Sequence, residues 1–253
     1  MNTYGLIGYR LGHSFSKKYF TNKFSLENIS ECIYENFELD AIVDFPALIS
    51  NNLSIKGLNC TIPYKQDIMT YLDEIDAEAK QIGAVNTIKI IRTHDKVRLK
   101  GFNTDCYGFE MSLKPLLSNY HKKALVLGTG GASKSVHFVL NELNIEAISV
   151  SRTANPKLNI LSYEQLNENI ISEHKLIINA TPLGTFPKVD ECPNIPYKYI
   201  TKKHYLYDLV YNPACTLFLE KGKEMGSIIK NGDEMLRLQA ERAWEIWNNN
   251  NLK

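Results

Sequence analysis

A glycine-rich turn at residues 128–131 is the part of the chain best suited to bind a phosphate. It follows an apolar run and precedes apolar residues at helical spacing, which predicts a buried strand, a tight turn and a helix. Gly128 and Gly130 would let the backbone approach a pyrophosphate, which the N–H groups at the helix start would meet. The third small position of the dinucleotide-binding pattern is Ser133. The stretch predicts a dinucleotide-binding unit. The alternative is a turn that only connects a strand to a helix and binds no ligand.

An arginine follows the next strand-like segment of this unit, at 146–150. Arg152 lies 24 residues after Gly128, about where an NAD-binding unit usually carries an acidic residue for the ribose hydroxyl. A guanidinium suits a 2′-phosphate instead, because it can bind the phosphate through paired, charge-assisted hydrogen bonds. The alternative is an exposed arginine after a strand. We therefore predict NADP rather than NAD as the cofactor.

Polar side chains in the N-terminal half of the chain gather where predicted strands end or turns begin. Because α/β folds place ligands at the carboxyl ends of strands, such a set is a candidate site for a small molecule. A lysine after a strand is more often solvated surface, however, and an aspartate before a helix, here 107–117, is often its N-cap. The set consists of Asn59, Lys65, Asn86, Asn103 and Asp105.

Two serines, Ser14 and Ser16, lie in the loop after the first predicted strand. In extended backbone their hydroxyls would point the same way, because residues two apart share a face. The alternative is that Ser16 caps the helix that follows and that Ser14 is solvated.

Alternating strand-like and helix-like segments indicate an α/β protein that positions these residues. After residue 123 the alternation predicts a parallel, doubly wound sheet. Strands are expected at 4–8, 33–37, 55–62, 83–88, 97–101, 124–127, 146–150, 175–180 and 206–210. Helices are expected from about 16, over 42–49 with an interruption near Pro46, over 68–82, over 107–117, over 134–140 and from about 233.

Composition narrows the class of protein. A length of 253 residues allows two domains, and a net charge of +1 provides no general field for nucleic acid or an anionic membrane. The five cysteines contain no Cys-x-x-Cys pair, and the six histidines do not fall at helical ligand spacing, so we predict no disulfide framework and no metal. The N-terminus lacks a signal-like segment and no apolar run approaches the ~18 residues of a membrane span. The cytoplasm is the expected location.

Motifs spread almost end to end along the chain, together and in this order, resemble those of the shikimate dehydrogenase family. They are HSFS at 13–16, NCTIPYK at 59–65, GAVNT at 83–87, NTD at 103–105, GTGGA at 128–132, SRT at 151–153, NATPLG at 179–184 and the segment 232–239. The resemblance implies NADP-linked interconversion of shikimate and 3-dehydroshikimate in chorismate biosynthesis. It also implies a substrate-binding domain with a mixed sheet at 1–105, a Rossmann-like NADP-binding domain at 106–232, and a helix at 233–253 that packs back on the first domain.

The resemblance also implies roles for individual residues. Lys65 and Asp105 would be the catalytic pair, because a lysine ammonium can both stabilise the alkoxide that forms from a ketone and give it a proton. As a base in the reverse direction, Lys65 needs a lowered pKa, which a neighbouring aspartate opposes. Residues implied to bind substrate are Ser14 and Ser16 at the carboxylate, with Tyr211 nearby, and Thr61, Asn86, Asp105 and Gln239 at the ring hydroxyls. Residues implied to bind the cofactor are Gly128, Gly130, Gly131, Ala132, Ser151, Arg152, Thr153, Thr181 and Gly232.

The chain departs from the family pattern at several positions. Lys17 stands where proline commonly follows the serine pair, so the first helix is expected to begin differently. The stretch 154–157 lacks the regular helix and the second arginine often found there, so the 2′-phosphate clamp would rest on Arg152 with Thr153 or Lys157 assisting. Affinity for NADP is therefore expected to be lower than is usual in the family.

Two rival functions differ in chemistry. A dual quinate and shikimate dehydrogenase would use NAD, which Arg152 argues against. A non-catalytic metabolite-binding homologue would not need Lys65, Asp105 and the nucleotide motif together, and the sequence offers no appended DNA-binding unit. The expected partner is a small-molecule substrate and neither nucleic acid nor a membrane, with monomer and homodimer left open.

Overall fold

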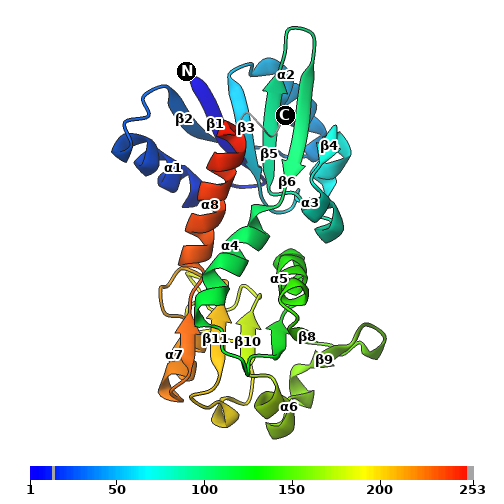
Figure 1. Cartoon of the computed structure of the whole chain (residues 1–253), viewed down its shortest axis with the longest axis vertical. Helices are drawn as coiled ribbons and strands as arrows, with labels where there is room; N and C mark the ends of the chain where they lie inside the picture. The colour runs from blue at the N-terminus through cyan, green and yellow to red at the C-terminus, as the bar shows by residue number, and fades with distance from the viewer. Residues whose placement is uncertain (13–14, 250–253) are drawn as a thin grey trace. The chain divides into compact units, whose positions relative to one another are not determined.

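The computed structural model describes residues 1–12 and 15–249, and the chain divides into two compact units (Figure 1). Unit 1 contains residues 1–107 and the chain from 239 onward, and unit 2 contains residues 108–238. The chain passes from one unit to the other after residue 107 and after residue 238, in each case within a helix. The expected domain boundaries were 105 and 232. Within the described ranges, no helix is long and apolar enough to cross a bilayer.

A mixed six-stranded sheet forms the centre of unit 1. The three strands at one side run parallel, and the next two form a hairpin whose first strand is antiparallel to both of its neighbours. A short last strand runs parallel to the second strand of that hairpin. In spatial order the strands are β2 (Cys32–Glu38), β1 (Asn2–Gly8), β3 (Ile55–Cys60), β5 (Thr87–Arg92), β6 (Val97–Phe102) and β4 (Glu74–Ile75).

Helices of unit 1 cover both faces of this sheet. Alternate residues of β1 point to opposite faces, so each set packs against different helices. Tyr4 and Leu6 pack with aromatic residues of the first and last helices, whereas Ile7 packs with residues 45 and 49. The helices are α1 (Phe15–Leu26), α2 (Phe45–Asn51), α3 (Ala77–Ile82), the first turn of α4 (Thr104–Leu113) and the end of α8 (Asp233–Asn248), with short 3₁₀ helices at Ile42–Asp44 and Asp67–Tyr71.

The end of α8 is fixed to the sheet at a glycine. A Cβ on Gly57 would stand 2.3 Å from Cδ1 of Trp247, so the strand needs glycine to admit the indole ring. The indole Nε1 donates to the carbonyl of Ile88 at 3.0 Å, and the ring stacks on Tyr4. This segment of α8 therefore belongs to the core of unit 1.

The expected helix over 68–82 is wrong. This stretch forms a 3₁₀ helix, the strand β4 and the helix α3. Asp73 accepts a hydrogen bond from the backbone N–H of Leu99 at 2.7 Å, and Asp76 caps α3 by accepting from Glu78 N at 3.2 Å. Aspartate side chains that bind backbone donors in this way end one element and begin another. The helical stretch expected over 42–49 does change near Pro46, from the 3₁₀ helix Ile42–Asp44 to α2. Pro46 lies in the first turn of α2, where its missing N–H leaves no helical hydrogen bond unmade.

Unit 2 is a parallel sheet with helices, which confirms the expected α/β class. All of its strand pairs are parallel. The spatial order is β12 (Ile228–Lys230), β11 (Tyr205–Asp208), β10 (Leu176–Asn179), β7 (Lys123–Leu127), β8 (Glu146–Ser151) and β9 (Ile160–Ser162). The helices are the rest of α4 and the start of α8, α5 (Gly131–Glu142), α6 (Glu168–Glu173) and α7 (Leu217–Glu224), with 3₁₀ helices at Lys114–Leu116, Pro156–Leu158, Tyr163–Gln165 and Tyr197–Tyr199.

Candidate functional site

An ammonium and a carboxylate from distant segments meet in unit 1. Lys65 Nζ donates to Asp105 Oδ2 at 2.7 Å, and the two side chains are 28% and 12% exposed. Lys65 lies in the turn after β3, and its carbonyl accepts from Val85 N at 2.8 Å, which ties this turn to the segment before β5. The pair is therefore held by three segments of the unit while solvent still reaches it.

Asn103, not Asp105, caps the helix that carries the carboxylate. The Oδ1 atom of Asn103 accepts from the backbone N–H groups of Asp105 at 3.0 Å and Cys106 at 3.3 Å, and its amide donates to the carbonyl of Ala84 at 3.0 Å. The helix begins at residue 104 rather than at 107. The cap interpretation of Asp105 is therefore wrong, and its carboxylate, in the first turn of α4, is available to Lys65.

The charge state of Lys65 follows from two opposing effects. Burial alone would lower the pKa of the ammonium, but the negative charge of Asp105 and its hydrogen bond outweigh burial and raise that pKa above its ordinary value. Lys65 is therefore a cation at neutral pH in the ligand-free protein. A lysine that acts as a base from the resting state would need a lowered pKa, but the surroundings of Lys65 raise it.

Asn86 is held beside this pair with one end of its amide committed. Its Oδ1 accepts from the backbone N–H of Thr104 at 2.8 Å and from the hydroxyls of Thr104 at 3.2 Å and Thr87 at 3.1 Å. Its Nδ2 makes a long contact of 3.4 Å with Oε1 of Gln239. Because the oxygen is fully used, Asn86 has N–H groups to offer, which suit a hydroxyl oxygen of a ligand.

Ser16 lies in a second polar group of unit 1. It is the second residue of α1, so the interpretation of Ser16 as the helix cap is wrong. Its side chain hydrogen-bonds to the hydroxyl of Tyr34, which donates to Asn59 Oδ1 at 2.8 Å. Thr61 follows β3 and is partly exposed. Ser14 lies outside the described residues.

The glycine-rich turn of unit 2 has the backbone that a pyrophosphate requires. Gly128 has φ of +105°, which favours glycine, and a Cβ there would stand 3.0 Å from Cγ2 of Thr181. Around Gly130 and Gly131, no heavy atom of the described chain comes within 4 Å of an added Cβ, and Ala132 is exposed. The turn fits a dinucleotide phosphate at the start of α5.

Ser133, the irregular member of the glycine motif, is buried and its hydroxyl donates to the carbonyl of Gly130 at 2.6 Å. A small polar residue therefore fits this position without leaving an unsatisfied group.

The expected 2′-phosphate residues follow β8, beside the glycine-rich turn. β7 and β8 are parallel neighbours, so their carboxyl ends lie at the same edge of the sheet. Ser151 ends β8, its hydroxyl accepts from Thr153 N at 3.4 Å, and Arg152 and Thr153 are exposed. Burial raises the pKa of Tyr163, and the charge of Arg152 partly opposes that rise. The exposed Arg152 therefore lies near Tyr163 at this edge.

Two further expected residues lie elsewhere in unit 2. Gly232 donates its N–H to the carbonyl of Val210 at 3.1 Å, and a Cβ there would stand 2.2 Å from the carbonyl oxygen of Leu209, so only glycine fits. Tyr211 is 38% exposed. Of the residues expected for catalysis and substrate binding, the structure brings Lys65, Asp105, Asn86 and Gln239 together in unit 1.

A buried carboxylate in unit 2 was missed by the sequence reasoning. Asp208 ends β11 with its whole surface buried, and it accepts hydrogen bonds from Thr216, Asn179 and Val210. Burial raises the pKa of Asp208 to about 6, although these hydrogen bonds oppose the rise. The available signal was a single carboxylate within the apolar run 205–210, which needs partners when buried.

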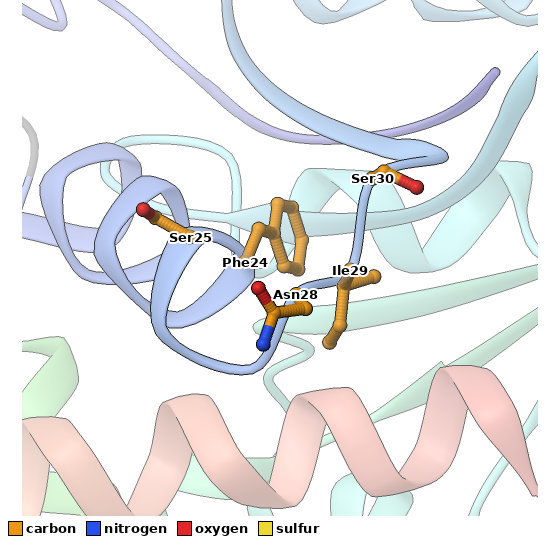
Figure 2. A pocket seen from close by; sticks show the side chains of 5 residues that line it. All are labelled: Phe24, Ser25, Asn28, Ile29 and Ser30. Atoms are coloured by element: carbon orange, nitrogen blue, oxygen red, sulfur yellow. The ribbon is translucent and has the colours of Figure 1, made fainter.

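Other polar clusters and hollows do not add to the site. Across residues 1–12 and 15–249, no three His, Cys, Asp or Glu side chains are grouped to hold a metal ion. A hollow of about 500 Å³ lies at the end of α1 and in the turn after it, and Figure 2 shows the side chains that line it. Its lining residues carry no titratable side chain: Phe24, Ser25, Asn28, Ile29 and Ser30.

Comparison with known proteins gives consistent matches. Residues 6–88 match the family described as shikimate dehydrogenase substrate binding domain. A shikimate dehydrogenase (NADP(+)) of Clostridium beijerinckii is 40% identical over 98% of this chain and 92% of its own, and one of Methanosphaera stadtmanae is 35% identical over 96% and 90%.

Solved structures agree with these relatives. Shikimate 5-dehydrogenase of Thermus thermophilus in complex with NADP(H) and shikimate has a TM-score of 0.81 and 30% identity, covering 98% of this chain and 94% of its own. Quinate dehydrogenase of Corynebacterium glutamicum in complex with NAD has a TM-score of 0.85 and 25% identity, covering 98% and 93%.

The raised pKa of Asp208 predicts a pH dependence of stability. Between the unfolded value of about 4 and about 6, the native protein holds a proton that the unfolded chain has lost, so this group's contribution to stability falls as pH rises through that window. Asp208→Asn should remove that loss, which amounts to about 2–3 kcal/mol. Urea unfolding of both proteins at pH 4.5 and 7.5 measures it, and equal pH slopes would contradict the assignment.

Proposed function

Because the chain belongs to the shikimate dehydrogenase family, we propose that it catalyses the reversible, NADPH-dependent reduction of 3-dehydroshikimate to shikimate in chorismate biosynthesis. The observation that carries the proposal is the hydrogen-bonded pair of Lys65 and Asp105, at 2.7 Å and partly open to solvent. An oxidoreductase that forms a CH–OH group from a ketone needs a proton donor at the substrate oxygen, and the ammonium of this pair can serve as one.

Lys65 acts as the acid in the reducing direction. When bound, NADPH would supply the hydride, and negative charge would then develop on the substrate oxygen. The ammonium of Lys65, kept charged by Asp105, stabilises this oxygen and gives it a proton. Asp105 holds the ammonium in place and offers its remaining acceptor capacity to a ring hydroxyl.

The substrate hydroxyls are bound by fixed groups around this pair. Asn86 donates from an amide whose oxygen is already used, and Gln239 lies at its nitrogen. Thr61, which follows β3, is the third residue that binds the substrate hydroxyls. Ser16 and Ser14 bind the carboxylate.

NADP is held by unit 2. The glycine-rich turn receives the pyrophosphate, and Arg152 binds the 2′-phosphate, with Ser151 and Thr153 beside it. Thr181 and Gly232 complete the set. The exposed guanidinium after β8 is what favours NADP over NAD. The protein works in the cytoplasm, as a monomer or a homodimer.

Quinate oxidation with NAD is the second candidate, favoured by the structural likeness to a quinate dehydrogenase. The assay that separates the candidates offers the purified protein shikimate or quinate, each with NADP or NAD, and follows the absorbance of the reduced nicotinamide. We expect shikimate with NADP to give the highest kcat/KM. No turnover with any pair would indicate a non-catalytic homologue.

Substitutions at the pair should separate turnover from binding. Lys65→Ala should lower kcat about 10²–10⁴-fold with little change in the KM for shikimate, because the proton donor is lost. Asp105→Asn should lower kcat and also raise the KM for shikimate, because it contacts the ring. Steady-state kinetics measure both, with Lys80→Ala on the exposed side of α3 as the control lysine. Unchanged turnover in Lys65→Ala would refute the assignment.

The pH profile of shikimate oxidation should report the charge of Asp105. In this direction Lys65 must first lose its proton, so log kcat should rise with pH from 7 to 10, because the pKa of Lys65 is raised. Asp105→Asn removes the main raising cause and leaves burial, which lowers the pKa. Its profile should therefore level off at a lower pH, and identical profiles would speak against the coupling.

A further inference from the structure

Three neighbouring strand ends of unit 2 are joined by a buried polar chain. β11, β10 and β7 are parallel, and Asp208, Asn179 and Leu127 occupy one register position across them. Beyond that position lie Thr181 and the glycine-rich turn. We propose that Asn179, held by Asp208, is a positioning residue for NADP, because it fixes Thr181 against Gly128. This inference rests on the proposed function of unit 2 in binding NADP.

The polar chain begins at a carboxylate that accepts three hydrogen bonds. Thr216 Oγ1 donates to Asp208 Oδ2 at 2.5 Å, and Asn179 Nδ2 and Val210 N donate to Oδ1 at 2.9 and 3.0 Å. Three donors match the acceptors of an ionised carboxylate. Burial raises the pKa of Asp208 to about 6, so the group is mostly ionised at neutral pH. The nearby Tyr197 and Tyr207, whose pKa values are raised by burial, remain neutral.

Asp208 decides the orientation of the Asn179 amide. With Nδ2 toward the carboxylate, Oδ1 accepts from the backbone N–H of Thr181 at 3.0 Å and from its hydroxyl at 2.6 Å. The opposite orientation would set the amide oxygen against a carboxylate and its NH₂ against two donors. Because Asn179 and Asp208 are both fully buried, water does not relieve that conflict. The amide is therefore fixed in one orientation.

The last step runs from Thr181 to the phosphate turn. Its methyl carbon lies 3.0 Å from the point where a Cβ on Gly128 would stand, and Ala180 N donates to the carbonyl of Leu127 at 2.9 Å. Thr181 Oγ1 also accepts from Leu183 N at 3.3 Å, so one hydroxyl orders the whole loop after β10. Loss of Asn179 would free the residue that packs on the glycine-rich turn.

A matched pair of variants tests the proposal in the full chain. Asn179→Ala and Thr216→Val each remove one side-chain donor to Asp208, but only Asn179 also holds Thr181. Asn179→Ala should raise the Kd for NADPH, measured by fluorescence titration, and the KM for NADP about tenfold, while the KM for shikimate stays within about twofold. Thr216→Val should leave the Kd for NADPH within about twofold, although it removes the cap of α7.

Asn179→Asp provides a second readout and serves if Asn179→Ala does not fold. The new carboxylate keeps an acceptor for Thr181 but faces Asp208, and two carboxylates this close cannot both ionise. A shared proton restores the donor toward Asp208. NADPH should therefore bind this variant about as tightly as wild type at pH 5.5 and more weakly as pH rises, with no such trend in wild type.

The outcomes separate this inference from the proposed function. Wild-type affinity for NADPH in Asn179→Ala, or equal weakening in Thr216→Val, overturns the positioning role. The same holds for a pH-independent Kd in Asn179→Asp. If wild type binds NADPH but does not oxidise shikimate, the proposed activity fails while the positioning result stands.

Discussion

The ion pair between Lys65 and Asp105 is the interaction on which the account of this protein depends. Burial by itself would favour a neutral amine at Lys65, and the adjacent carboxylate reverses that preference. Reduction and oxidation of the substrate therefore need different charge states of Lys65 in the proposed mechanism. In the proposed mechanism, Lys65 carries the proton that ketone reduction uses, and alcohol oxidation must first remove that proton.

Asparagine side chains beside strands fix nearby backbone in both units. The amide oxygen of Asn86 accepts from the start of α4, and that of Asn179 accepts from the loop after β10. Their amide nitrogens point to Gln239 and to Asp208, respectively. Asn103 uses its oxygen in the same way to start α4. A carboxamide suits this task because its two ends have opposite hydrogen-bonding polarity, so one fixed end determines the other.

The sequence predicts the fold class well because apolar runs and alternation report burial directly. It fails where a single polar side chain decides a boundary, as at Asp73 and Asp76 within the expected helix 68–82. Spacing also does not choose between Asp105 and Asn103 as the cap of α4, since both residue types are good caps. Lys65 and Asp105 were expected as a pair through family resemblance, whereas Asp208 became visible only with its three donors in place.

A titration of the Lys65 amine measures the central claim most directly. Nuclear magnetic resonance of protein labelled with ¹⁵N-lysine, with the Lys65 signal assigned by its absence in Lys65→Arg, follows that group in the ligand-free enzyme. The account predicts a midpoint above the ordinary lysine value of about 10.4. A midpoint below that value would show that burial outweighs Asp105 and that Lys65 does not rest as the proton donor.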